Sequence, residues 1–344
     1  MHLRKSLFIL LSLTALPVFA DFKALPLKVP VPADNPMTAD KIELGKMLFF
    51  DPRLSIDGTV SCNSCHNVMY HGGDGRPVGV GIHGQRGGRG SPTVWNSAFQ
   101  TVQFWDGRAA TLEDQAKGPL INGVEMGMTS HDFTLERLRQ IPGYVQAFKK
   151  AFPKDKNSIT IDTMARALAT YERTLITPNS PFDKYIRGNK KAMTPQQIKG
   201  MKLVDEIGCT SCHTGDNFSG EGFKMGEGNY QPFPQIPGSK YDKMYDLTSD
   251  LGRYEVTKKV EDKNHWRVPT WRNIAITAPY FHNGKVKTLD EAVRVMAKTQ
   301  LDADLNDTQV SDIVAFLNAL TGEFPKQMMP MLPNTANMTV TPEP

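Results

Sequence analysis

The chain has 344 residues, of which 40% are hydrophobic, so it can bury the cores of about two domains. Its 40 basic and 36 acidic residues leave a net charge of only +4. This balance gives no reason to expect a nucleic-acid partner, which normally calls for a strongly basic surface.

The first twenty residues have the pattern of a signal peptide. Arg4 and Lys5 form a charged start, residues 7–16 are an apolar run, and Val18-Phe19-Ala20 supplies small residues just before the expected cleavage point. The apolar run is shorter than the roughly 20 residues that span a bilayer. We therefore expect removal of residues 1–20, export to the periplasm, and no membrane span in the mature chain.

Much of the mature chain carries the apolar spacing of helices. Residues 21–36 contain four prolines and are expected to be extended. Helices are predicted over residues 38–49, 131–150, 160–175, 194–207, 288–298 and 307–320. Thr194, followed three residues later by Gln197, is a typical helix start. Alternation typical of strands is scarce, so the predicted fold class is all-α.

All four cysteines lie in two Cys-x-x-Cys-His motifs, which is the spacing used for covalent attachment of haem c. Each pair of thiols can form thioethers to one haem, and the histidine that follows can bind its iron. A zinc site normally needs four ligands, and each motif offers three. We therefore predict two haems c, with attachment and axial residues Cys62, Cys65 and His66 in the first motif and Cys209, Cys212 and His213 in the second.

A weak internal repeat joins the two halves. Residues 92–96 (Pro-Thr-Val-Trp-Asn) align with residues 269–273 (Pro-Thr-Trp-Arg-Asn) at an offset of 177, and the register continues to Thr111 and Thr288. The repeat predicts two cytochrome c-like domains with long loops, related by a pseudo-twofold axis. The expected boundaries are 1–20 for the signal peptide, 21–180 for the first haem domain, 181–322 for the second, and 323–344 for a tail.

The two copies differ where the second axial ligand of each iron is expected. In the second copy Met296 is a candidate, with Met225 and Met244 as alternatives, and a thioether ligand raises the haem potential. The equivalent residue in the first copy is Pro119, which cannot bind iron.

Two histidines, His71 and His83, are the nearby candidates for the first iron. Both belong to residues 71–91, which contain nine glycines. Such a loop is costly to order and easy to move, so a ligand on it can be released. The alternative is a solvent-exposed loop histidine.

The first copy also contains Gln115 and Glu125, a pair without a counterpart in the second. A carboxylate beside an open haem face can take a proton from bound peroxide and return it to the leaving oxygen, while an amide holds the peroxide by hydrogen bonding. A solvated helix face is the alternative for such a glutamate. Trp105, equivalent to His282, is expected near the seam between the domains, either on an electron path or as core packing.

The chain resembles the bacterial dihaem cytochrome c peroxidases over residues 36–322. The segments that carry the resemblance are 45–55, both haem motifs, 91–94, 104–109 and 277–284. The resemblance implies a low-potential peroxidatic haem on the first motif, with His83 as its removable ligand and Gln115 and Glu125 as catalytic residues. It also implies Trp105 between the haems and a high-potential second haem with Met296 as its sixth ligand.

The resemblance further implies a calcium ion at the domain interface. The carbonyls of Thr277 and Pro279 match two of its ligands, and Gly90 stands where close relatives have an asparagine. Carbonyl oxygens with water still suit calcium. The implied activity is reduction of hydrogen peroxide by electrons from a small periplasmic cytochrome c or cupredoxin, in a homodimer.

Two other functions were weighed against this one. A dihaem oxidase that matures protein cofactors carries tyrosine where Met296 stands, so the sequence argues against it. A plain dihaem electron carrier would have two methionine-ligated haems, and Pro119 with the pair of Gln115 and Glu125 argues against that.

Overall fold

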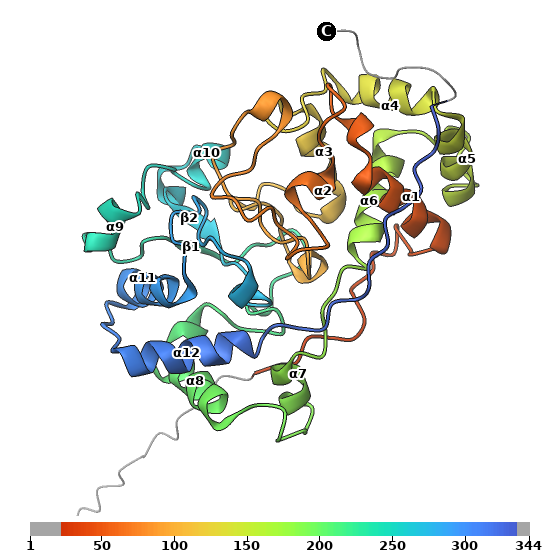
Figure 1. Cartoon of the computed structure of the whole chain (residues 1–344). Coiled ribbons are helices and arrows are strands. Elements are labelled where there is room, and N and C mark those ends of the chain that lie inside the picture. Colours follow the sequence, from red (N-terminus) through yellow and green to blue (C-terminus); the bar gives the residue numbers. More distant parts are fainter. Residues whose placement is uncertain (1–21, 336–344) are drawn as a thin grey trace, which may run out of the picture.

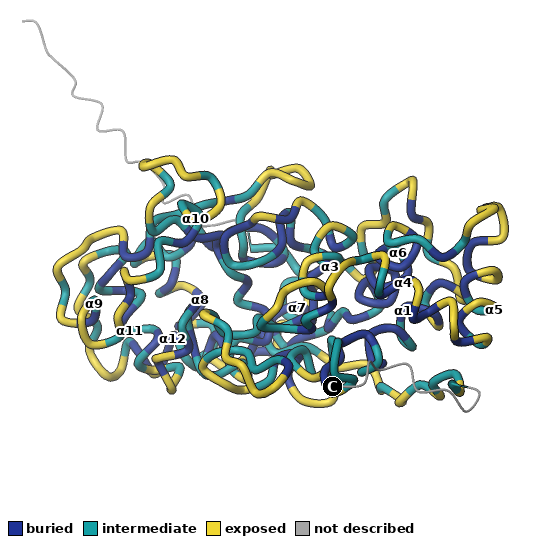
Figure 2. Tube along the Cα trace, turned by 90° about the horizontal axis from the view of Figure 1, so that it is seen from above, coloured by how far each residue is buried: buried dark blue, intermediate teal, exposed yellow. Residues whose placement is uncertain are grey.

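The computed structural model describes residues 22–335 and is mostly helical (Figure 1). The predicted signal peptide and the end of the predicted tail lie outside the described residues. Seen from above, the molecule is elongated, with α9 (Lys240–Met244) at one end and α5 (Pro142–Ala151) at the other (Figure 2). The described part contains no helix that is both long and apolar enough to cross a membrane.

The first half is organised around a helix crossing. Helix α1 (Ala39–Phe50) packs against α6 (Ile161–Glu172), and α3 (Leu112–Ile121) packs on α6 as well. A Cβ added at Gly45 would lie 1.9 Å from the carbonyl oxygen of Ala167, so only glycine allows this close approach. Helices α4 (His131–Arg139) and α5 complete this half, and α2 (Cys62–Cys65) carries the first haem motif.

The second half repeats this crossing with other helices. Helix α8 (Pro195–Glu206) packs against α12 (Asp307–Asn318), and a Cβ at Gly200 would lie 1.9 Å from the carbonyl oxygen of Asp312. Helix α11 (Leu289–Leu301) lies beside α12. The remaining elements are α7 (Pro181–Ile186), α9, α10 (Tyr254–Thr257) and the antiparallel strands β1 (Tyr230–Pro232) and β2 (His265–Arg267).

Short 3₁₀ turns complete the secondary structure. They cover Pro52–Leu54, Ile82–Gly84, Ser97–Phe99, Cys209–Ser211, Val260–Asp262 and Ile274–Ile276. The second haem motif therefore begins in such a turn, whereas the first forms one turn of α-helix.

The helix predictions are confirmed for α1, α6, α8, α11 and α12, and the Thr194 start of α8 is a capping box with Gln197. The single helix predicted over 131–150 is wrong, because the chain breaks after Arg139 and resumes at Pro142, whose ring suits a first helical position. Helix α3 was not predicted, since it contains Gly118 and Pro119. The two-stranded sheet was not predicted either.

The sequence repeat corresponds to a repeated backbone geometry. Asn96 and Asn273, 177 residues apart, are both left-handed, with φ of 63° and 62°. Phe104 and Phe281 match in the same way, with φ of 66° and 67°. The isolated bridges Gln103–Ala109 and Tyr280–Val286 also keep this offset. The pseudo-twofold arrangement and the domain boundaries themselves stay predictions.

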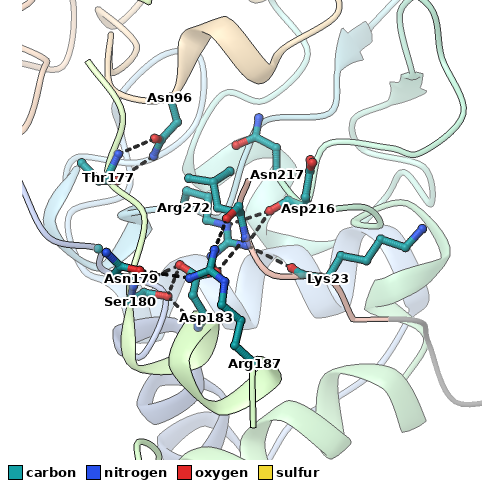
Figure 3. A network of polar contacts seen from close by, with 12 residues as sticks. Lys23, Asn96, Thr177, Asn179, Ser180, Asp183, Arg187, Asp216, Asn217 and Arg272 are labelled. Carbon is teal, nitrogen blue, oxygen red and sulfur yellow. Dashed lines mark hydrogen bonds and ion pairs between the residues drawn. The ribbon is translucent and has the colours of Figure 1, made fainter. Parts of the chain in front are cut away.

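The two asparagines of the repeat meet at Thr177 (Figure 3 shows Asn96). The side-chain amides of Asn96 and Asn273 donate to the Thr177 hydroxyl at 2.8 and 2.9 Å. Each asparagine also receives a backbone N–H on its Oδ1, from Thr177 and Gly322 respectively. One threonine between α6 and α7 therefore joins equivalent points of both halves.

A buried ion pair lies close to this junction (Figure 3). Arg272 donates to Asp183 at 2.7 Å, and both side chains are fully buried. Arg272 also binds the carbonyl oxygens of Asp216 and Lys23, and Asp183 accepts the backbone N–H of Leu25 at 2.8 Å. The pair thus fastens the extended N-terminal segment and α7 to the second half.

Residues 323–335 return along the first half to the region of α4 and α5 (Figure 1). The ring of Phe324 packs edge-on against buried Trp95 at 4.9 Å, and Tyr171 donates to Gln327 Oε1 at 3.2 Å. Arg53 donates to the carbonyl oxygen of Pro333 at 2.9 Å. The end of the described chain is therefore part of the packing of the first half.

Candidate functional site

The first haem motif opens on a cavity of about 340 Å³, here called the first cavity. Cys62, Cys65 and His66 line it. His66 Nδ1 lies 2.9 Å from the carbonyl oxygen of Pro92, which leaves Nε2 available for a metal. Burial lowers the pKa of His66, so its ring is held neutral, the form that binds a metal.

The predicted catalytic pair lies on the wall of this cavity. Gln115, from α3, and Glu125, from the loop after it, both line it, and so does Pro119. Asn122 donates to Glu125 Oε1 at 2.9 Å. Burial raises the pKa of Glu125, and the nearby Arg108 guanidinium partly opposes the shift. A carboxyl group with a raised pKa can hold and release a proton nearer neutral pH.

His83 does not line the first cavity. Its side chain is 65% exposed, its φ is 54°, and its Nδ1 lies 3.6 Å from Asp57 Oδ2. The structure therefore does not bring His83 to His66. Its role as a ligand stays a prediction that requires the loop to rearrange.

The glycine-rich loop is fixed in this position by its contact with the segment that carries Glu125. A Cβ added at Gly81 would lie 2.0 Å from the carbonyl oxygen of Val124. The Ile82 N–H donates to the carbonyl oxygen of Glu125 at 3.0 Å. Because Gly81 has no side chain, the loop can sit directly on the backbone of the catalytic segment.

The second haem motif opens on another cavity, of about 250 Å³, here called the second cavity. Cys209, Cys212, His213 and Met296 line it. His213 Nδ1 lies 2.9 Å from the carbonyl oxygen of Phe218, and its ring stacks on Trp271 with centroids 4.3 Å apart. Burial lowers the pKa of His213 to about 4, so this ring too is neutral.

Of the three methionines weighed for the second iron, only Met296 faces the second cavity. It lies on α11, next to buried Val295 and Ala297. Met225 and Met244 are 48% and 58% exposed and line neither cavity. The geometry thus favours Met296 over the two alternatives as the residue able to reach a metal bound by His213.

One wall separates the two cavities and lines both. It consists of Gly90, Ser91, Pro92, Thr93, Gln100, Trp105 and Arg267. Trp105 donates from Nε1 to the carbonyl oxygen of Gly90 at 2.9 Å. The indole is therefore held between the two sites, where an electron path was predicted.

The chemistry of these linings fits two haems c. Both pairs of thiols are free at the cavity walls, and each histidine is oriented by a backbone carbonyl. Arg267 is buried on the shared wall, its Nη1 has no hydrogen-bond partner among the described residues, and burial lowers its pKa to about 10. A buried, unpaired cation is costly unless an anion meets it, and haem carries two carboxylates.

The sequence reasoning missed Glu172, which lies at the end of α6 and lines the first cavity. Burial raises its pKa to about 8. One signal was available, since Glu172 is four residues after Leu168, which lines the same cavity from the same helix face. The effect of Arg108 on the pKa of Glu125 was also missed. Nothing in the sequence around Arg108 indicates that the two side chains lie near each other.

The predicted calcium ligands lie on the lining of the second cavity. Thr277, Pro279 and Gly90 all contribute to it. The Gly90 carbonyl oxygen already accepts from Trp105. Among the described residues no cluster of three or more His, Cys, Asp or Glu side chains could hold a metal, so a calcium ion would depend on carbonyl oxygens and water.

Comparison with known proteins agrees with this arrangement. A family model described as di-haem cytochrome c peroxidase matches residues 39–191. The cytochrome c551 peroxidase of Pseudomonas aeruginosa is 45% identical over 94% of this chain and 90% of its own length. The chain belongs to the di-haem cytochrome c peroxidase family. It is accordingly a peroxidase of the oxidoreductase class, and its family holds two haems c.

Other known proteins are also similar to this chain. The cytochrome c551 peroxidase of Nitrosomonas europaea is 42% identical over 92% of this chain and 90% of its own. Among solved structures, a MauG-like protein associated with microbial copper homeostasis superposes with a TM-score of 0.75 at 27% identity, over 88% of this chain and 95% of that one. The diheme peroxidase BthA of Burkholderia thailandensis, with a TM-score of 0.66 at 22% identity, over 92% of this chain and 97% of that one, shares the fold.

Proposed function

We propose that this chain is a periplasmic dihaem cytochrome c peroxidase. It reduces hydrogen peroxide to water with electrons from a small c-type cytochrome or a cupredoxin, and it works as a homodimer. The overall reaction joins one hydrogen peroxide, two electrons and two protons to give two waters. The signal peptide pattern and the names of the similar peroxidases support the compartment and the kind of donor.

The observation that carries the proposal is the difference between the two cavities. Gln115 and Glu125 line the first, where Pro119 takes the place of an axial ligand. Met296 lines the second together with His213. The first site therefore offers space for a small oxidant together with an amide and a carboxyl group to bind and protonate it.

A haem held by Cys62, Cys65 and His66 would bind peroxide at its iron and supply the electrons that break the O–O bond. Glu125 takes a proton from the nearer peroxide oxygen and delivers it to the leaving oxygen, which departs as water. Gln115 orients the peroxide by hydrogen bonding. The raised pKa of Glu125 suits this double role, because the group must accept and return a proton within one turnover.

Electrons enter at the second site and pass by way of Trp105 to the first. Supporting this path, Trp105 lines both cavities and is oriented by its hydrogen bond to Gly90. We further propose two cytochrome c-like domains, 21–180 and 181–322, about a pseudo-twofold axis. The matching geometry at Asn96 and Asn273 supports this division.

The proposal includes release of His83 from the first iron when the second haem is reduced. In support, His83 lies in the glycine-rich loop, its side chain is exposed, and it does not line the first cavity. A calcium ion held by the carbonyl oxygens of Thr277, Pro279 and Gly90 is part of the same proposal. Chelation is expected to slow turnover, and added calcium to restore it.

Spectra of the oxidised and half-reduced holoprotein, followed by addition of peroxide, test the proposal. A peroxidase is expected to show an open, high-spin first haem in the half-reduced form and to be oxidised rapidly by peroxide. A dihaem electron carrier would stay low-spin at both haems and would react slowly. That second outcome would overturn the peroxidase assignment.

A further inference from the structure

His71 is a buried histidine that the proposed mechanism does not use. It is only 4% exposed and begins the glycine-rich loop five residues after His66. Although it follows the first haem motif, its side chain lines the second cavity and not the first. Neither of its ring nitrogens has a hydrogen-bond partner among the described residues.

A buried imidazole without a partner is expensive. A neutral ring carries at least one N–H, and leaving a buried donor unsatisfied costs about 1–3 kcal/mol. Buried polar groups in folded proteins are therefore nearly always bonded to protein, water or ligand. The two free nitrogens of His71 indicate that a group filling the second cavity completes their hydrogen bonding.

The neighbouring unpartnered atoms show what kind of group this is. Besides His71, the second cavity is lined by Trp266, Arg267 and His282, and each has a buried nitrogen without a partner in the described structure. Trp266 Nε1 and Arg267 Nη1 can only donate. A wall with this many free donors suits an acceptor-rich, anionic ligand, and the carboxylates of a haem meet that description.

One carboxylate of the protein faces the same cavity. Asp74 lies three residues after His71, lines the second cavity, and has a buried Oδ2 without a partner among the described residues. This carboxylate partly offsets the lowering of the His71 pKa by burial. Burial is still the largest influence, so the ring stays neutral with one N–H to donate.

The backbone of His71 is linked to the first haem site through residues 92 and 93. Thr93 donates from Oγ1 to the carbonyl oxygen of His71 at 2.7 Å. The preceding residue, Pro92, is the one whose carbonyl oxygen meets His66 Nδ1 at 2.9 Å. The ring of His71 thus lines the second cavity, while its backbone is bonded to the segment of residues 92–93 that orients His66 in the first cavity.

We propose that His71 donates a hydrogen bond to a carboxylate of the second haem and so anchors the start of the 71–91 loop to that haem. This rests on the proposed function in its assignment of the second cavity to a haem. His71 is then a positioning residue that links the second haem to the loop carrying His83. Reduction of a haem held there would make its carboxylate a stronger acceptor, so the hydrogen bond from His71 would tighten and hold the start of the loop more firmly.

The test compares three variants of the holoprotein by spectroelectrochemical titration of both haems. His71→Leu removes the donor, His71→Gln keeps an N–H donor, and His265→Leu makes the same change at a histidine of β2 that lines neither cavity. In His71→Leu the midpoint potential of the second haem is expected to fall, because the carboxylate loses the donor that compensates its charge. His71→Gln and His265→Leu should stay close to the wild type.

Equal potentials for the second haem in wild type, His71→Leu and His71→Gln would overturn the proposal and indicate that water satisfies the ring. If His71→Leu does not load two haems, His71→Met, which fills the space without a donor, takes its place against His71→Gln. The titration uses no peroxide. A protein that fails as a peroxidase can therefore still confirm the anchor, and an active peroxidase can still refute it.

Discussion

The two cavities begin from the same five-residue pattern and differ in nearly everything around it. The first is bordered by two carboxyl groups, the half-buried Glu125 and the buried Glu172, both with raised pKa values. The second is bordered by Met296, by Trp271 stacked on His213, and by several buried nitrogen donors without partners among the described residues. The shared motif attaches the cofactor, and the surroundings decide its task.

Several features of the backbone are nevertheless the same in both halves. The helix crossings at Gly45 and Gly200 keep the same close approach in both halves. The left-handed asparagines keep the same backbone angles. The linings differ, because Pro119 stands where the second half has Met296, and Trp105 stands where it has His282.

Removing the carboxylate from the first cavity is expected to have the largest effect. In Glu125→Gln the acid–base group is lost, and we expect kcat/KM for peroxide to fall by about 10²–10⁴-fold. Steady-state turnover with a reduced cytochrome c measures it. Glu136→Gln, the same change at an exposed site on α4, is the control and should be neutral. An unchanged rate in Glu125→Gln would remove Glu125 from the mechanism.

Replacing Met296 by histidine is expected to lower the midpoint potential of the second haem. Met296→His replaces a thioether by an imidazole, so the midpoint potential of the second haem should fall by a sizeable part of the roughly 0.8 V that axial ligands span. Potentiometric titration measures the shift. Met244→His, at an exposed methionine, is the control. An unaltered potential in Met296→His would show that another residue is the ligand.

The buried ion pair Asp183–Arg272 tests how strongly the stability of the second half depends on this contact. Asp183→Asn leaves Arg272 buried without its charge partner and should lower the free energy of unfolding by about 3–5 kcal/mol. Urea unfolding of the holoprotein measures it. Asp246→Asn, which breaks the exposed pair with Lys285, should cost about 0–1 kcal/mol. Equal losses in the two variants would contradict this account of the junction.

The smallest effect is expected from the second carboxyl of the first cavity. Burial raises the pKa of Glu172 from its usual 4.5 to about 8. Between these values the unfolded chain releases the proton while the native chain keeps it, so stability should fall as pH rises through this window. The free energies of unfolding at pH 5 and pH 8, measured by urea titration, should differ less in Glu172→Gln than in the wild type, by on the order of 1–3 kcal/mol. Parallel pH dependence in both proteins would show that Glu172 does not carry it.

The sequence predicted those features of the molecule that are set by residues close together in the chain. The capping box at Thr194, the apolar faces of α11 and α12 and the haem motifs are all of this kind. Helix α3 was missed because its stability comes from packing on α6, which compensates for Gly118 and Pro119. Tertiary packing overrides propensity in such cases.

The site shows the same limit. The repeat register placed Trp105 at the seam, and the structure has it on the wall shared by both cavities. The position of His83 could not be read from the sequence, because it depends on the contact of Gly81 with Val124, more than forty residues away. The buried environments of Glu172, Arg267 and His71 likewise arise only when distant segments come together.

The returning tail has a consequence for how the protein is made. Phe324, Gln327 and Pro333 complete the packing around Trp95, Tyr171 and Arg53. During synthesis these residues emerge after both haem motifs have left the ribosome. The first half therefore receives these contacts only after the second half has been synthesised. A chain cut short before residue 323 would carry every residue proposed for catalysis and still leave its first half unfinished.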